Sequence, residues 1–301
     1  MTFGAFILIL SSAVFHASWN LLSKSNRPSL VFYMQASMTA GILWLAFVFW
    51  GVQKIDWSTV PTAFWVMFAG SVACEVTYFT GLANAYKRAD ISMAYPMARA
   101  LPVLFTAILT LIFHIGEPLS LLCMVGMVLI FAGCFIMPLA NFRALKLSTY
   151  LNSHFIFIVL AACGTTGYTI FDSQALKCLK NSFDASDKVI ISCMYLGILE
   201  ICICSTMFIV TRFIKNEREE FKKRFCRSIA PSFSGIFSTL AYGMILLAMP
   251  MVTNVSLVQA FRQVSLPICA LAGVILLHEK MTAPRVTGFI LIFSGLILSV
   301  F

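Results

Sequence analysis

Long stretches without a charged side chain limit most strongly what this chain can fold into. No Asp, Glu, Lys or Arg occurs in residues 28–53, 118–142 or 228–261. A helix needs about 20 consecutive apolar residues to cross a bilayer. The composition agrees, because 60% of the 301 residues are apolar and 11% are charged, whereas a soluble domain has about 25% charged residues. We therefore predict an all-α polytopic membrane protein.

The gaps between charges, read together with turn residues, predict ten transmembrane helices. Residues 1–4 contain no basic side chain before the first apolar stretch, so we expect no cleaved signal peptide. The ten cysteines form no C-x-x-C pair, which argues against a redox motif or a zinc knuckle. The expected helices are 3–22, 30–51, 62–86, 92–114, 119–139, 154–176, 189–213, 229–249, 252–277 and 283–301.

The chain divides into two halves of five helices each. We expect a first repeat over 1–139, a linker over 140–153 and a second repeat over 154–301. The same pattern at the same point in both halves indicates an internal repeat. Both halves end with the spacing E-x8-G-x6-G, formed by Glu117, Gly126 and Gly133 in the first and by Glu279, Gly288 and Gly295 in the second.

The shared pattern has a physical explanation. Two glycines seven residues apart lie on one helix face and let a neighbouring backbone approach closely, which favours helix association in lipid. An acidic residue at the start of a helix is stabilised by the helix dipole. We therefore expect Glu117 and Glu279 to open and cap the last helix of each half, with a role in substrate binding as the alternative.

The chain resembles a known family at this point. Five-plus-five helices, a repeated glycine-rich helix, and the stretch 16–24 (HASWNLLSK) are similar to the drug/metabolite transporter superfamily, EamA type. The resemblance implies inverted repeats around a central cavity, with the fourth and ninth helices helping to line it. An odd number of spans in each half also forces opposite orientations, which is the geometry of alternating access.

The orientation of the chain in the membrane stays open. Most of the 21 basic residues follow odd-numbered helices, above all in 213–227. The positive-inside rule places those loops in the cytoplasm and both termini outside. The family resemblance implies both termini inside.

Five charged residues fall within the predicted spans: Glu75, Arg99, Asp172, Glu200 and Arg262. Charge at membrane depth is costly, so a functional site is the first hypothesis. The alternative is a set of buried ion pairs that hold helices together. Asp172 lies close enough to a helix end to reach the interface. Glu75 lies near the middle of its helix, where a low-dielectric surrounding favours the neutral form, and is the predicted proton-linked group.

The two arginines carry the prediction about substrate charge. A guanidinium binds a carboxylate or phosphate in a fork and keeps its charge at depth. We therefore expect a ligand with an anionic group, an amino-acid-like zwitterion or organic acid rather than a cation. The competing possibility is that the three carboxylates neutralise both arginines.

Other polar and aromatic residues share helix faces with these charges. Polar groups this dense should face a cavity, because lipid would leave their hydrogen bonds unmet. An interfacial aromatic belt is the alternative for Trp19. The full predicted substrate site comprises His16, Trp19, Asn20, Glu75, Tyr78, Tyr95, Arg99, Tyr168, Asp172, Glu200, Gln259, Arg262 and Gln263.

Sequence motifs of enzymes are weak or missing. His278-Glu279-Lys280 lacks the second His of a zinc protease helix, and no G-x-S-x-G or P-loop occurs. We predict a non-enzymatic secondary transporter of a small organic metabolite in the bacterial cytoplasmic membrane. We expect possible proton coupling, contact with membrane lipid, no cofactor, no nucleic acid, and a monomer or homodimer. The alternatives are a lipid-carrier flippase, an intramembrane enzyme, and a sensor subunit.

Overall fold

All regular structure in the described part of the chain is helical. The computed structural model describes residues 2–26, 28–88, 91–137, 139, 141–144, 155–277 and 281–299. Three 3-10 turns, η1 (Phe142–Ala144), η2 (Ala185–Asp187) and η3 (Met249–Met251), accompany the α-helices. The α-helices are α1 (Phe3–Ser25), α2 (Leu30–Val52), α3 (Thr62–Arg88), α4 (Ile91–Ile112), α5 (Leu121–Ile136), α7 (Phe155–Leu179), α8 (Lys188–Phe213), α9 (Lys215–Arg224), α10 (Ala230–Ala248), α11 (Val255–Arg262), α12 (Ser265–Leu277) and α13 (Ala283–Leu298).

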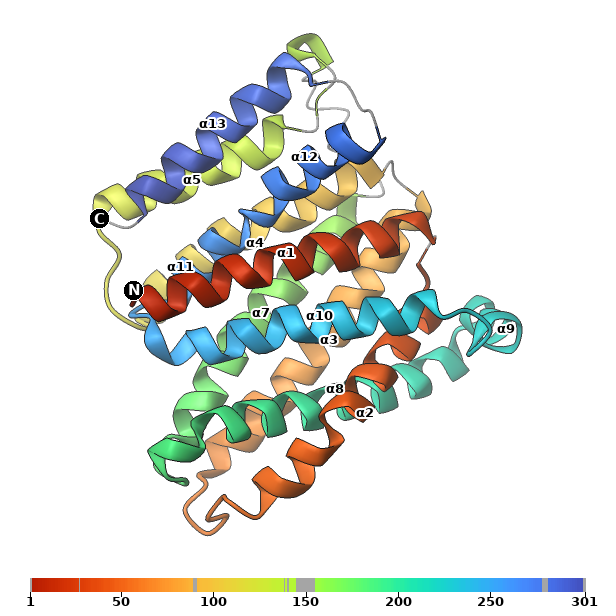
Figure 1. Ribbon diagram of the computed structural model, residues 1–301, viewed down its shortest axis with the longest axis vertical. Coiled ribbons are helices and arrows are strands. Elements are labelled where there is room, and N and C mark those ends of the chain that lie inside the picture. Colours follow the sequence, from red (N-terminus) through yellow and green to blue (C-terminus); the bar gives the residue numbers. More distant parts are fainter. Residues whose placement is uncertain are drawn as a thin grey trace.

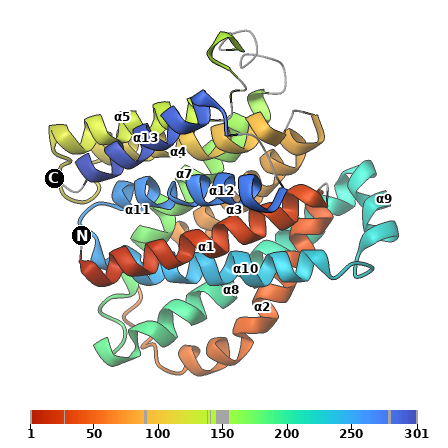
Figure 2. The same cartoon turned by 45° about the horizontal axis from the view of Figure 1, so that its top comes forward.

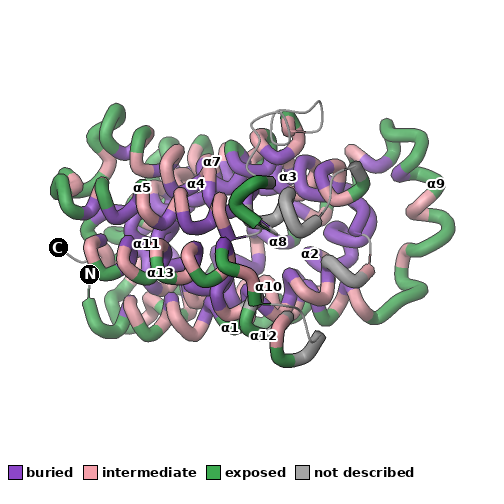
Figure 3. Tube along the Cα trace, turned by 90° about the horizontal axis from the view of Figure 1, so that it is seen from above, coloured by how far each residue is buried: buried purple, intermediate pink, exposed green. Residues whose placement is uncertain are grey.

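The helices have the lengths and surfaces of a membrane protein. Within the described residues, six helices (α1, α2, α3, α7, α8 and α10) are long and apolar enough to cross a bilayer, and shorter apolar helices include α5 and α13. Large apolar side chains such as Phe3 and Trp65 are exposed on the outside of the bundle, and Figure 3 shows buried segments along its centre. An aqueous surface would not expose so many apolar side chains, so this surface suits contact with lipid.

Helices of the first half pack mainly on helices of the second half. The most extensive contacts join α3 to α7, α2 to α8, α1 to α10, and α5 to α13. In Figure 1, the α5–α13 pair forms one edge of the bundle and the α2–α8 pair forms the opposite edge. The start of α1 and the end of α13 lie at the same end of the bundle, whereas α9 lies at the other end (Figures 1 and 2).

The predicted ninth helix, 252–277, is broken into α11 and α12. Pro267 has no N–H to donate to the carbonyl of Gln263 four residues earlier. The N–H of Leu266 binds that carbonyl instead, at 2.9 Å. The carbonyl of Arg262 is therefore released from the helical ladder, and the chain turns between the two helices at Gln263 and Val264.

The polar segment after the predicted seventh helix, expected to be a loop, forms the helix α9. Its sequence favours a helix, because Glu217 lies in the first turn and Lys222, Lys223 and Arg224 lie in the last turn. Glu217 is buried and accepts hydrogen bonds from Lys87 and from the backbone N–H of Val31. This carboxylate therefore ties α9 to α3 and to the start of α2.

The glycine pairs of the repeated motif face each other across the α5–α13 contact. A Cβ atom at Gly126 would lie 2.5 Å from the carbonyl oxygen of Gly295, and one at Gly133 would lie 2.7 Å from that of Gly288. The predicted close approach of two backbones is therefore confirmed.

The predicted capping role of Glu117 is wrong. Helix α5 begins at Leu121, and the Ser120 hydroxyl accepts the N–H of Cys123 at 3.0 Å. Glu117 is exposed, and its backbone carbonyl accepts the Asn254 side chain at 2.9 Å. The segment before α5 therefore holds the residue that caps α11. Glu279 lies outside the described residues.

Candidate functional site

Seven of the predicted site residues meet around one small cavity among the central helices. It has a volume of about 40 Å³ and is bounded by side chains from α1, α3, α7, α8, α10 and α11. The predicted residues that line it are His16, Trp19, Glu75, Tyr78, Tyr168, Glu200 and Arg262. The lining residues that the sequence did not single out are Phe79, Leu199, Ile203, Ser238 and Tyr242.

Arg262 brings a positive charge to this cavity from the last residue of α11. Its side chain is 1% exposed. The Nη2 atom donates to the Tyr168 hydroxyl at 3.2 Å, and the guanidinium carbon lies 5.9 Å from the centre of the Tyr168 ring and 5.7 Å from that of Tyr242. The Nε and Nη1 atoms have no hydrogen-bond partner. Part of the guanidinium is therefore free to bind something else.

His16 and Trp19 lie one turn apart on α1 and bind each other. The indole N–H of Trp19 donates to Nδ1 of His16 at 2.9 Å. Because an indole N–H can only donate, Nδ1 must accept, and the proton of a neutral His16 ring then lies on Nε2. Asn20 is buried but does not line the cavity, since its amide donates to the His16 carbonyl at 2.6 Å.

The three buried carboxylates have different surroundings. Glu75 and Glu200 line the cavity. Asp172 does not, because it accepts hydrogen bonds from Tyr195, at 2.5 Å, and from Tyr242. Its position near a helix end had suggested that it reaches the membrane interface, but its side chain is fully buried in the protein. Asp172 therefore fixes the position of a tyrosine that lines the cavity.

The buried charges do not form the expected ion pairs. Within the described residues, no carboxylate oxygen lies within 4.0 Å of either Arg99 or Arg262. Arg99 does not line the cavity. Its Nη2 atom donates to the released carbonyl of Arg262 at 3.0 Å and to the Ser265 hydroxyl at 2.9 Å, while its Nε has no partner. The two arginines thus perform different tasks.

The remaining predicted residues do not reach the cavity. Gln259 donates to the Thr169 hydroxyl at 2.8 Å, and Gln263 donates to the Gln259 carbonyl at 2.9 Å. Both glutamines are buried in helix contacts, although the side-chain oxygen of Gln263 has no hydrogen-bond partner. The side chain of Tyr95 lies outside the described residues.

Tyr242 and Ser238 are the polar lining residues that sequence reasoning missed. They lie one turn apart on α10, in the middle of a span with no charged residue. The signal that could have found them is the one-turn spacing of two hydroxyl side chains on an apolar helix. Tyr78 and Tyr168 were found by the same spacing, but from a charged residue.

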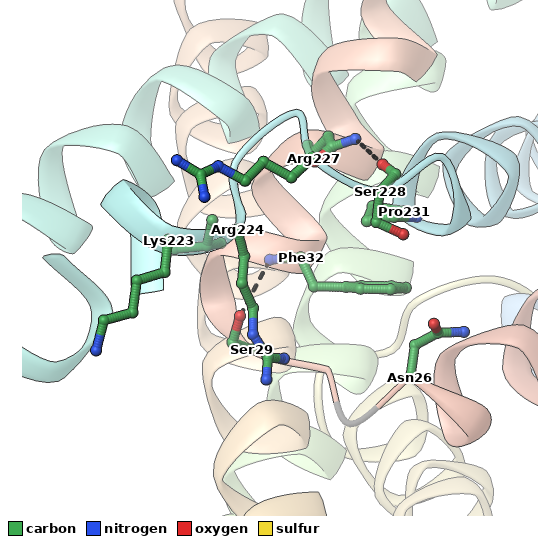
Figure 4. Close-up of a pocket in the computed structure, with 10 residues that line it drawn as sticks. Asn26, Ser29, Phe32, Lys223, Arg224, Arg227, Ser228 and Pro231 are labelled. Atoms are coloured by element: carbon green, nitrogen blue, oxygen red, sulfur yellow. Dashed lines mark hydrogen bonds between the residues drawn. The ribbon is translucent and has the colours of Figure 1, made fainter. Parts of the chain in front are cut away.

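A second, larger cavity lies at the α9 end of the molecule. It has a volume of about 230 Å³ and is bounded by the end of α1, the start of α2, α9 and the start of α10 (Figure 4). Its basic side chains are exposed, and Arg224 is already paired with Glu220 at 3.0 Å. It contains none of the predicted site residues, so we place the candidate site in the central cavity.

The central cavity offers hydrogen-bond donors, acceptors and aromatic surfaces to a small polar solute. Arg262 and the Nε2–H of His16 donate, whereas the carboxylates of Glu75 and Glu200 accept. Aromatic side chains of this kind present apolar faces with polar tips. In the described residues, no group of three or more His, Cys, Asp or Glu side chains is placed to hold a metal ion.

Comparisons with known proteins agree with this combination of membrane helices and a polar cavity. Twenty-eight solved chains match in structure. One of them, described only as "Crystal structure of protein", shares the fold with a TM-score of 0.67. Its sequence is 14% identical, and the match covers 98% of this chain and 96% of the other. No curated relative matches the sequence. The family model described as "Sugar transport protein" matches residues 33–301. Because this match covers most of its length, the chain belongs to the Sugar transport protein family, a family of membrane transporters.

Proposed function

We propose that this protein is a secondary transporter that moves a small sugar-like solute across the membrane by alternating access. The observation that carries the proposal is the buried polar cavity, which is lined by helices of both halves inside a bundle with an apolar exterior. A buried set of mixed donors and acceptors is costly unless a solute or another polar group binds there. Family membership supports a sugar-like solute.

The pattern of helix packing supports an inverted repeat of the drug/metabolite transporter type. In such a repeat of five helices over 1–139 and five over 154–301, the first helix of one half corresponds to the first of the other. The contact of the third helix, α3, with α7 then corresponds to the contact of α10 with α1, and both are among the most extensive in the molecule. The α2–α8 and α5–α13 contacts each join equivalent helices. This proposal requires ten spans, with α11 and α12 counted as one broken span.

The broken span supports alternating access. Discontinuous helices near the middle of a membrane are a common device for substrate binding in transporters, because their freed backbone groups lie beside the solute site. Here the break directly follows Arg262, which lines the cavity. A volume of about 40 Å³ holds only a few water molecules. The proposal therefore requires the cavity to widen when solute enters from either side.

The test is solute flux with the purified full-length protein in sealed liposomes. A labelled sugar or sugar derivative should enter only liposomes that contain the protein, should exchange with unlabelled solute inside, and should be recovered chemically unchanged. Recovery of a converted product would identify an intramembrane enzyme. Movement of a lipid-linked sugar between leaflets without flux of the free sugar would identify a flippase. No flux of any tested solute, despite solute binding, would favour a sensor subunit.

The driving force is a separate part of the proposal. No nucleotide-binding motif occurs in the sequence, so we propose coupling to protons through Glu75, which lines the cavity and is 6% exposed. We further propose that the protein functions in a bacterial cytoplasmic membrane, as a monomer or homodimer.

A further inference from the structure

Arg262 is a buried cation without an ion-pair partner among the described residues. Its side chain is 1% exposed, and its Nε and Nη1 atoms have no hydrogen-bond partner. No described carboxylate oxygen lies within 4.0 Å of it. Burial of an unpaired charge is strongly unfavourable. The free N–H groups are charge-assisted donors, which bind an anionic acceptor more strongly than a neutral one.

A second donor lies beside the guanidinium. The Nε2 atom of His16 lies 3.4 Å from Nη2 of Arg262. Because Nδ1 accepts the indole N–H of Trp19, Nε2 carries the ring proton, so this contact brings two donors together and cannot be a good hydrogen bond. Two donors at this separation, both lining one cavity, need a shared acceptor. An oxyanion satisfies both.

The rest of the cavity narrows the chemical class of the solute. Glu75 and Glu200 line the same space and are acceptors for hydroxyl groups when ionised. The single guanidinium of Arg262 can neutralise a singly charged carboxylate but not a doubly charged phosphate. Tyr78 and Tyr168, whose ring centres lie 5.9 Å apart, provide apolar surface for the C–H groups of a sugar.

We propose that the substrate is a sugar acid, a polyhydroxy compound with one carboxylate. Arg262 and His16 bind the carboxylate, and Glu75 and Glu200 accept hydrogen bonds from the hydroxyls. This inference rests on the proposed transport function and adds the charge of the solute to it.

Binding to the purified full-length protein, measured by isothermal titration calorimetry, tests the inference. The probes are D-glucuronate, D-glucose, glucose 6-phosphate and lactate. We expect D-glucuronate to bind at least about tenfold more tightly than D-glucose, because a charge-assisted hydrogen bond is stronger than a neutral one. Arg262→Lys keeps the charge but loses the planar set of N–H donors, and should remove most of this preference. Arg212→Lys is the matched control, because Arg212 is exposed and packs over Phe208 and Phe221 at the end of α8.

Each outcome decides between the two proposals. Equal binding of D-glucose and D-glucuronate overturns the sugar-acid inference and leaves the transport proposal intact. Tightest binding of glucose 6-phosphate also overturns it, in favour of a sugar phosphate. Binding of lactate without either sugar supports the anion site but overturns the sugar-like substrate. If Arg262→Lys does not fold, the comparison of the two sugars on the unmodified protein still decides the point.

Discussion

Helix α4 and the helix pair α11–α12 contain similar residues, but α4 is continuous and the pair is broken. Each contains one buried arginine followed by a proline: Arg99 and Pro102 in α4, and Arg262 and Pro267 in the pair. In α4 the proline follows three residues after the arginine, and the helix continues through it. In the second half the distance is five residues, and the helix breaks directly after Arg262.

The position of the break explains why the two arginines differ. Pro267 lies in the first turn of α12, five residues after Arg262, and the released carbonyl of Arg262 accepts hydrogen bonds from Arg99 and Ser265. One arginine therefore stabilises the break, and the other, placed at the break, contributes its guanidinium to the cavity. Arg99 thus supports the break, whereas Arg262 lines the cavity.

The largest expected effects come from replacing each arginine by methionine, because the two variants should lose different properties. Arg262→Met removes the cation that we propose binds solute, and uptake should fall by about 100-fold. Thermal stability should be unchanged or higher, since an unpaired buried charge is removed. Arg99→Met also removes a buried charge, but it takes away two good hydrogen bonds at the break and should destabilise the protein by about 1–3 kcal/mol. Uptake in liposomes and thermal unfolding separate the two, and equal losses of stability would contradict the division of roles.

The second prediction concerns the prolines. In Pro267→Ala the new backbone N–H can bind the Gln263 carbonyl, which returns the Arg262 carbonyl to the helical ladder and displaces Arg99. Uptake should fall by about tenfold, because small misplacements of binding groups are costly. Pro102→Ala is the matched control and should change uptake by less than about twofold, because α4 is already continuous. If both variants behave alike, the break is not what orients Arg262.

Glu75→Gln should abolish the part of uptake that a proton gradient drives. Glu75 lines the cavity with Arg262, and the amide cannot exchange a proton. Accumulation in response to an imposed pH gradient should fall to the level seen without a gradient, while exchange of solute continues. Glu117→Gln is the control, since Glu117 is exposed. Unchanged gradient-driven accumulation in Glu75→Gln would exclude this residue as the coupling group.

The smallest effect is expected from Trp19→Phe. This change removes the indole N–H that fixes the proton of His16 on Nε2, so the ring can adopt the other tautomer. Affinity for solute should fall by about two- to fivefold, in keeping with the loss of one hydrogen bond. Asn20→Ala, on the same helix but outside the cavity, should have a smaller effect. A larger loss in Asn20→Ala would show that α1, rather than His16, is being perturbed.

The helices of the fold were largely predictable, because their signal is local. Apolar runs without charges give the positions of α1, α2, α7, α8 and α10 to within a few residues at most ends. The break at Gln263 was not predictable from Pro267 alone, since α4 contains Pro102 and stays continuous. In the structure the released carbonyl accepts hydrogen bonds from Arg99, which lies in the other half of the chain, and from the Ser265 hydroxyl.

The candidate site was predictable only where charge marks it. Arg262, Glu75 and Glu200 stand out in apolar spans, and they do line one cavity. Asp172 stands out equally but is held by Tyr195 and Tyr242, which lie on two other helices. Sequence spacing cannot show which charged side chains have such distant partners.

The glycine contact between α5 and α13 has a consequence for how this sequence can change over time. Gly126 of one helix lies against Gly295 of the other, and Gly133 lies against Gly288. An alanine at any of these positions adds a carbon against backbone, which no side-chain rotation can relieve. Each copy of the duplicated motif packs against the backbone of the other, so the two copies cannot diverge independently. A substitution in one half can be accepted only together with a shift of the backbone in the other.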